Sequence, residues 1–77
     1  MLTMYFQNSA GNKRVIGTGE TENDCMKIMY DFLKDHNFES YYTRVWVSSE
    51  NPCFKKYDVG SHTEFFLCYN PNGWKDI

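Results

Sequence analysis

The chain has 77 residues, with eight Lys and Arg against ten Asp and Glu, and with six Phe, six Tyr and two Trp. This length predicts one domain spanning residues 1–77. A domain this small has a low free energy of unfolding, which burial of aromatic rings can raise. The net charge of −2 argues against nucleic acid as a partner, because binding to phosphates requires a basic face.

No apolar run is long enough to span a bilayer, and the first residues lack the pattern of an export signal. We therefore expect a cytoplasmic protein that does not contact a membrane. The cysteines Cys25, Cys53 and Cys68 are odd in number and widely spaced, which predicts reduced thiols. No Cys or His pair has the spacing of zinc ligands, so we expect no metal and no cofactor.

The first elements in chain order form a predicted hairpin. Apolar and polar residues alternate over residues 2–7, as in a strand with one buried face. Residues 8–12 are a cluster of turn formers, and residues 13–18 carry Val15 and Ile16, enough for a second strand. The two strands are expected to pair antiparallel.

A helix is predicted from Thr21 to His36. The Thr21 hydroxyl can accept from the backbone N–H of Asp24, and the Asp24 carboxylate can reach back, as in a capping box. Asn37 is suited to a left-handed cap. An apolar stripe follows at steps of three and four residues, which predicts that one helix face packs on a flat surface. Its members are Cys25, Ile28, Met29, Phe32, Leu33 and His36.

Three more strands are predicted after the helix, over residues 40–48, 54–58 and 63–69. The first of them has apolar or amphipathic side chains on both faces, which indicates a central strand. Residues 59–62 are the expected turn between the last two strands. Residues 70–77 are expected to be a flexible tail, which Trp74 can pin to the domain.

The element order β-β-α-β-β-β predicts the α+β class, a single small domain with an antiparallel sheet and one helix packed on one face. A single helix layer cannot cover both faces of the sheet. The other face is therefore expected to stay partly open and to carry several of the surplus aromatic side chains.

The segment Tyr57–Phe66 gathers most of the polar groups that can carry chemistry. A catalytic triad of Asp58, Ser61 and His62 is disfavoured, because adjacent Ser and His side chains tend to diverge and no oxyanion hole is evident. As a turn, the segment would use Asp58 to accept backbone N–H groups and Gly60 to supply a positive φ. A structural turn, a binding surface and acid–base chemistry remain open, although we expect no catalytic residues.

Aromatic residues on the third and fourth predicted strands form a second candidate site. Tyr41, Tyr42, Trp46 and Tyr57, with Arg44 among them, have the composition of a protein-binding hot spot. A base-stacking platform would need more basic residues between the rings. An ordinary half-open sheet face with cross-strand pairs is the other interpretation.

The chain resembles a group of small uncharacterised proteins carried by phages and prophages of Gram-positive bacteria. The resemblance rests on the Asp-Val-Gly-Ser-His-Thr-Glu-Phe-Phe sequence of Asp58–Phe66 and on the upstream residues Tyr41, Tyr42 and Trp46. It implies a cytoplasmic accessory protein of a mobile element. Such proteins often inhibit host defence systems, so the resemblance also implies an inhibitor of the anti-CRISPR type.

We therefore expect a non-enzymatic protein that binds and modulates a host or defence protein. One alternative is a small ligand-binding protein or enzyme that uses Asp58, His62 and Glu64. Another is a structural or virion accessory protein that dimerises through an exposed edge strand, either residues 2–7 or residues 63–69. The candidate partner-binding residues are Tyr42, Arg44, Trp46, Tyr57, Asp58, His62 and Glu64.

Overall fold

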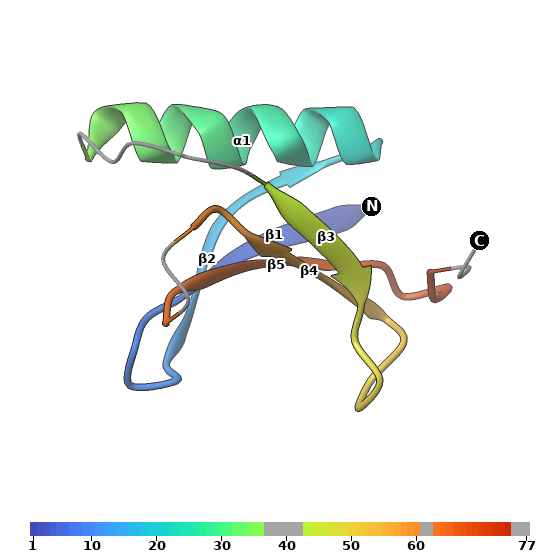
Figure 1. The fold of residues 1–77 in the computed structure, drawn as a ribbon. Coiled ribbons are helices and arrows are strands. Elements are labelled where there is room, and N and C mark those ends of the chain that lie inside the picture. Colours follow the sequence, from blue (N-terminus) through green and yellow to red (C-terminus); the bar gives the residue numbers. More distant parts are fainter. Residues whose placement is uncertain (37–42, 61–62, 75–77) are drawn as a thin grey trace.

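The computed structural model describes residues 1–36, 43–60 and 63–74, and it contains one helix lying across a strongly curved sheet (Figure 1). The elements in chain order are β1 (Leu2–Gln7), β2 (Lys13–Gly19), α1 (Glu22–Asp35), β3 (Arg44–Val47), β4 (Phe54–Asp58) and β5 (Phe65–Tyr69). The predicted α+β class and element order are confirmed. The last strand begins two residues later than predicted, and residues 40–42 of the third predicted strand lie outside the described residues.

All four strand pairings are antiparallel, and the strand order is β2-β1-β5-β4-β3. Two sequence predictions were wrong about this order. Strand β3 is an edge strand and not a central one, although both of its faces carry apolar side chains. Strands β1 and β5, expected as exposed edges for dimerisation, each have a neighbour on both sides, so their backbone groups are not available to a partner strand.

The helix begins as the sequence predicts. Thr21 is the N-cap, its hydroxyl accepts from the Asp24 backbone N–H, and the Asp24 carboxylate accepts from the Thr21 backbone N–H. The helix ends at the C-cap His36, whose φ of −102° is not left-handed, and the expected cap Asn37 lies outside the described residues. Three members of the predicted stripe, Cys25, Met29 and Leu33, are buried.

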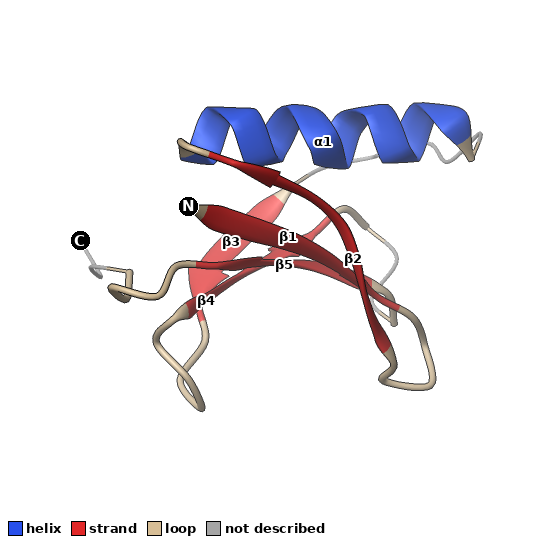
Figure 2. Cartoon of the chain, turned by 180° about the vertical axis from the view of Figure 1, so that it is seen from behind, coloured by secondary structure: helices blue, strands red, loops and turns tan. Residues whose placement is uncertain are grey.

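Strand β2 approaches the start of the helix very closely (Figure 2). A β-carbon added to Gly19 would lie 2.5 Å from the β-carbon of Asp24, inside any permitted contact distance. A β-carbon on Gly17 would lie 2.8 Å from the side chain of Ile28. The two glycines therefore let the backbone of β2 lie directly against the helix.

The core fills the space between α1 and the side of the sheet that carries Met4, Phe66 and Cys68. Cross-strand register places Met4 opposite Cys68, and Tyr57 opposite Phe66. The helix packs on β2, β1 and β5 and does not reach β3. Val45 of β3 lies beyond the helix and is exposed, although it is the register partner of the buried Tyr57.

Residues after β5 are attached to the domain as far as Trp74. The Trp74 backbone N–H donates to the Pro52 carbonyl at 2.9 Å, and its indole N–H donates to the Cys68 carbonyl at 2.9 Å. The ring packs against the core, with the Lys55 ammonium 4.6 Å from its centroid. Trp74 therefore holds the described part of the expected tail, residues 70–74, on the domain, and residues 75–77 lie outside the described part of the chain.

Candidate functional site

None of the described helices or strands covers the face of the sheet opposite α1 (Figure 2). We call it the open face. Its side chains form rows across the strands, because register partners in neighbouring strands point to the same side. The middle row crosses the whole sheet through consecutive partners, namely Val15, Tyr5, Leu67, Lys56 and Trp46.

At the β3 end of the open face, two aromatic rings and two cations form one group, which we call the Trp46 cluster: Arg44, Trp46, Lys56 and Phe65. The Trp46 and Phe65 rings meet edge to face, with their centroids 6.4 Å apart. The Arg44 guanidinium carbon lies 5.7 Å from the Trp46 ring, and the Lys56 ammonium lies 4.4 Å from the Phe65 ring. Both distances are within the range of cation–π interactions.

Trp46 is the most exposed ring of this cluster, with 38% of its surface accessible. It lies on an edge strand of only four residues, so a partner can approach it from the side as well as from the face. A large ring that is held by its neighbours and still open to solvent loses little conformational entropy on binding. This is the usual character of a residue that dominates an interface.

Charge is distributed unevenly between the two sides of the molecule. The open face carries Lys13, Arg44 and Lys56, and its one acidic position by strand alternation, Asp58, is only 3% exposed. The helix carries half of the described acidic residues, namely Glu22, Asp24, Asp31 and Asp35, with Lys27 and Lys34. The net charge of −2 therefore does not describe the open face, which is basic.

A second aromatic group lies at the other end of the open face. Tyr5 meets Phe54 edge to face at 5.9 Å, and Phe54 meets Tyr69 at 5.2 Å with an interplanar angle of 55°. All three side chains are half-buried. Since the rings pack against one another at steep angles, they form an apolar surface. Their faces are not parallel to one another.

Two predicted partner-binding residues are corrected by their burial. Tyr57 is fully buried between the sheet and α1, and Asp58 is 3% exposed, so neither side chain is available to a partner. Tyr57 faces the helix because β4 alternates and its even-numbered residues take the open face. Asp58 accepts from the Gly60 backbone N–H at 2.9 Å, and Gly60 has a φ of 102°, as the turn interpretation predicts.

The predicted binding residues do not form one site. Arg44 and Trp46 come together on the open face, whereas Glu64 lies on the helix side of the sheet and lines a cavity described below. Tyr42 and His62 lie outside the described residues, as do Tyr41 and Ser61. The hypothesis of acid–base chemistry by Asp58, His62 and Glu64 stays a prediction, because His62 lies outside the described residues.

Sequence reasoning missed Lys56 and Phe65 as members of the site. Both were placed correctly on their strands, and period-two alternation put each on the same face as other aromatic residues. The missing information was the register, which places Lys56 opposite Trp46 in one neighbouring strand and opposite Leu67 in the other. Register between strands cannot be read from either strand alone.

An ion pair between Lys55 and Glu22 lies on the helix side of the sheet, away from the Trp46 cluster. The Lys55 ammonium is 2.8 Å from Glu22 Oε2, and the Tyr57 hydroxyl donates to the same oxygen at 2.7 Å. Burial alone raises the pKa of Glu22, but the hydrogen bonds from Lys55 and Tyr57 and the Lys55 charge outweigh it and lower that pKa. Burial and the Glu22 carboxylate raise the pKa of the Tyr57 phenol, so it acts only as a donor.

Within the described residues, no group of three or more His, Cys, Asp or Glu side chains is arranged to hold a metal ion. The helix α1 is too short and too polar to cross a membrane. All three cysteines are free, with Cys25 and Cys68 buried in the core.

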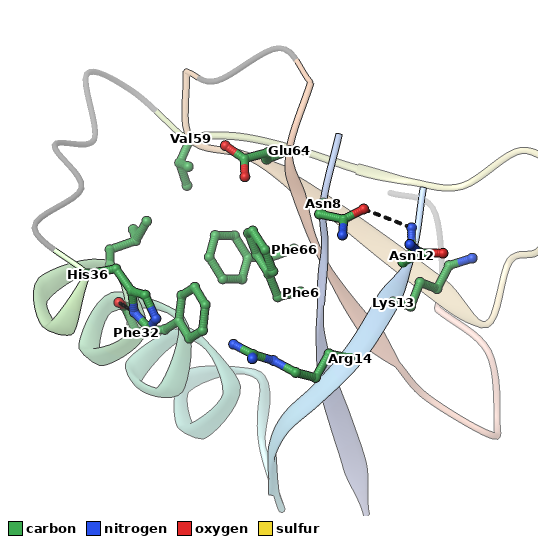
Figure 3. Close-up of a pocket in the computed structure, with 11 residues that line it drawn as sticks. Phe6, Asn8, Asn12, Lys13, Arg14, Phe32, His36, Val59, Glu64 and Phe66 are labelled. Carbon is green, nitrogen blue, oxygen red and sulfur yellow. Dashed lines mark hydrogen bonds between the residues drawn. The ribbon is translucent and has the colours of Figure 1, made fainter. Parts of the chain in front are cut away.

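A cavity of about 330 Å³ opens between the C-terminal half of α1 and the sheet (Figure 3). Phe6, Phe32 and Phe66 form its apolar wall, with ring centroids 4.9 to 5.6 Å apart. Arg14 and Glu64 are at its rim. The cavity and the open face lie on opposite sides of the sheet, except that Lys13, the first residue of β2, also lines the cavity.

No family model, no curated protein and no solved structure matches this chain at a significant level. The resemblance to phage and prophage proteins therefore stays a prediction.

Proposed function

We propose that this protein is a non-enzymatic binding module, and that it modulates a protein partner through the Trp46 cluster. The observation that carries the proposal is the exposed Trp46 ring, held between Phe65 and the Arg44 guanidinium on a basic, uncovered sheet face. Trp and Arg are the side chains most enriched among residues that dominate protein interfaces.

The expected partner surface follows from the chemistry of the cluster. Arg44 and Lys56 favour carboxylates around the contact, and the Trp46 and Phe65 rings favour an apolar pocket at its centre. The partner is therefore a protein with an acidic rim around an apolar depression. The acidic helix faces away from this contact and keeps the protein soluble without repelling the partner.

A single-stranded nucleic acid is a less suitable ligand for the same face. Base stacking requires open ring faces, whereas Lys56 lies over Phe65 and Arg44 lies near the Trp46 ring. The rings of Tyr5, Phe54 and Tyr69 pack edge on or tilted. Three cations on the open face would also neutralise few phosphates.

The cellular setting belongs to this proposal and rests on the resemblance. A mobile-element protein that acts on host defence would be an inhibitor, and binding through one rigid face is sufficient for inhibition by occlusion. The proposal requires no chemistry from the Asp58–Phe66 segment, whose acid Asp58 holds the β4–β5 turn.

The test is affinity capture from host cells with three forms of the chain: wild type, Trp46→Ala and Val15→Ala. Val15 is the matched control, since it is an exposed apolar residue (55% accessible) on the opposite edge strand. Proteins retained by the wild type and by Val15→Ala, and lost from Trp46→Ala, are then purified and measured by biolayer interferometry. We expect Trp46→Ala to weaken binding by about 30-fold or more, equivalent to about 2 kcal/mol.

Salt and nuclease treatment distinguish the kinds of partner. Binding that weakens with added salt and survives nuclease fits an acidic protein surface. Binding that nuclease abolishes would show a nucleic-acid ligand and contradict the proposal. Equal affinity of Trp46→Ala and wild type for every retained protein would also contradict it.

A further inference from the structure

We propose that the cavity beneath α1 binds a small aromatic carboxylate, with its ring against the phenylalanine wall and its carboxylate on Arg14. The proposal is independent of the Trp46 cluster, because the cavity lies on the helix side of the sheet. A volume of about 330 Å³ is at the lower end of the range for small-molecule sites. It suits a ligand of one or two fused rings.

The wall of the cavity is suited to a flat apolar body. Phe32 of α1 meets Phe66 of β5 edge to face at 5.6 Å, and Phe6 of β1 lies within 5.3 Å of both. These rings come from the three central elements of the fold, so the surrounding core holds them in place. A planar ligand ring can pack against both the edges and the faces of these aromatic side chains. It can therefore adopt the offset-stacked and edge-to-face arrangements that aromatic pairs prefer.

Arg14 and His36 both contact the Phe32 ring of this wall, and Lys13 also lines the cavity, on the β2 side. The guanidinium carbon of Arg14 is 5.6 Å from the Phe32 ring centroid, and Figure 3 shows the side chain extending from β2 toward that ring. The His36 ring stacks on the Phe32 ring with their centroids 4.1 Å apart, and the His36 Nδ1 lies 2.9 Å from the Phe32 carbonyl oxygen. Contact with Phe32 orients both groups before any ligand arrives.

The acidic residue of the cavity lies on the opposite side. Figure 3 shows the Phe6 and Phe66 rings between Arg14 and Glu64, with Glu64 next to Val59. A carboxylate ligand is repelled by Glu64 and attracted by Arg14, so the charges select a single orientation. Arg is suited to this role because its planar fork can hold both oxygens of a carboxylate.

The experiment is a titration of the ¹⁵N-labelled protein followed by amide chemical shifts, with 2-naphthoate as the probe. The neutral 2-naphthylmethanol and the cationic 2-naphthylmethylamine are the comparison ligands. We expect 2-naphthoate to shift the amides of Phe6, Arg14, Phe32 and Phe66, and to bind about tenfold more tightly than the alcohol. The amine is expected to bind most weakly.

Two variants at Arg14 test the carboxylate contact. Arg14→Met keeps an unbranched stem over Phe32, so it should weaken 2-naphthoate binding about tenfold and leave the alcohol unchanged. Arg14→Lys should retain most of the affinity for 2-naphthoate. Lys34→Met is the charge-matched control, because Lys34 is exposed on α1 and does not line the cavity. It should bind like the wild type.

Three results would overturn the proposal. The first is the absence of shifts in the cavity residues up to the solubility limit of 2-naphthoate. The second is equal affinity for the carboxylate, the alcohol and the amine. The third is an Arg14→Met variant that binds 2-naphthoate as the wild type does. Shifts confined to Trp46 and Phe65 would place the ligand on the open face and count against the cavity.

Discussion

The Tyr57 hydroxyl donates a hydrogen bond of 2.7 Å to Glu22 Oε2, and this contact joins strand β4 to the first turn of α1. The helix packs mainly on β2, β1 and β5, so the contact reaches across to a strand that the helix barely covers. The Lys55 ammonium contacts the same oxygen from two positions earlier on β4, on the same face as Tyr57. Two donors on one strand therefore fix the helix start relative to the half of the sheet that carries the Trp46 cluster.

Replacing Tyr57 by Phe should destabilise the protein by about 1–2 kcal/mol, the usual range for a lost hydrogen bond to a charged group that keeps another partner. The ring would stay in the core, so the fold should be retained. Urea unfolding followed by tryptophan fluorescence measures the change. Tyr30→Phe is the control, since Tyr30 is exposed on α1, and it should unfold within about 0.5 kcal/mol of the wild type.

Acid should lower the stability of the folded protein, in part because Glu22 becomes protonated. The pKa of Glu22 is lowered in the folded state, so its stabilising effect is complete above the unfolded pKa near 4.5 and is lost as the pH falls through the folded pKa. Glu22→Gln should be less stable than the wild type at pH 7, and the difference should be smaller at pH 3. Urea midpoints at the two pH values measure this difference.

The remaining acid sensitivity of Glu22→Gln has a separate source. Hydrogen bonds from the Thr21 and Glu20 backbone N–H groups lower the pKa of Asp24, and this contribution has the same sign. Lys55→Met should reduce the acid sensitivity partly, because it removes one of the two donors to Glu22. A Glu22→Gln variant with the full acid sensitivity of the wild type would contradict the assignment.

The three cysteines should react with iodoacetamide at very different rates. Burial raises the pKa of the Cys25 and Cys68 thiols, and both side chains are fully buried, so neither thiolate nor access is available in the folded state. Cys53 lies half-buried before β4 and should be modified first. Mass spectrometry of peptides from native and urea-unfolded samples measures the three rates. Labelling of Cys68 as fast as that of Cys53 in native buffer would be inconsistent with the described core.

Replacing Gly60 by Val should lower the free energy of unfolding by about 1–3 kcal/mol, because a β-branched residue is strained at the Gly60 φ of 102°. The turn before β5 would lose the hydrogen bond from the Gly60 N–H to Asp58 if the backbone relaxed. Thermal unfolding measures the cost. Thr18→Val is the control, since it places the same side chain at an exposed position of β2 and should leave the midpoint nearly unchanged.

Local features of the fold were predictable from the sequence, and long-range features were not. The helix was predicted within one residue at each end because the Thr21–Asp24 capping box and the apolar stripe are both local patterns. The burial of Tyr57 could not be predicted, since alternation separates it from Lys56 without saying which face the helix covers. The edge position of β3 was mispredicted because Val45 lies on the helix side, beyond the reach of the helix.

The pairing of β1 with β5 has a consequence for how the protein is made. Met4 lies opposite Cys68, so the centre of the sheet pairs two strands that are far apart along the chain, and β5 is synthesised well after β1. The β1–β2 hairpin and α1 can form early, but Leu2, Met4 and Phe6 lack their β5 neighbours until residues 65–69 have been synthesised. During translation the nascent chain therefore presents an incomplete apolar surface, which a chaperone can bind before the domain closes.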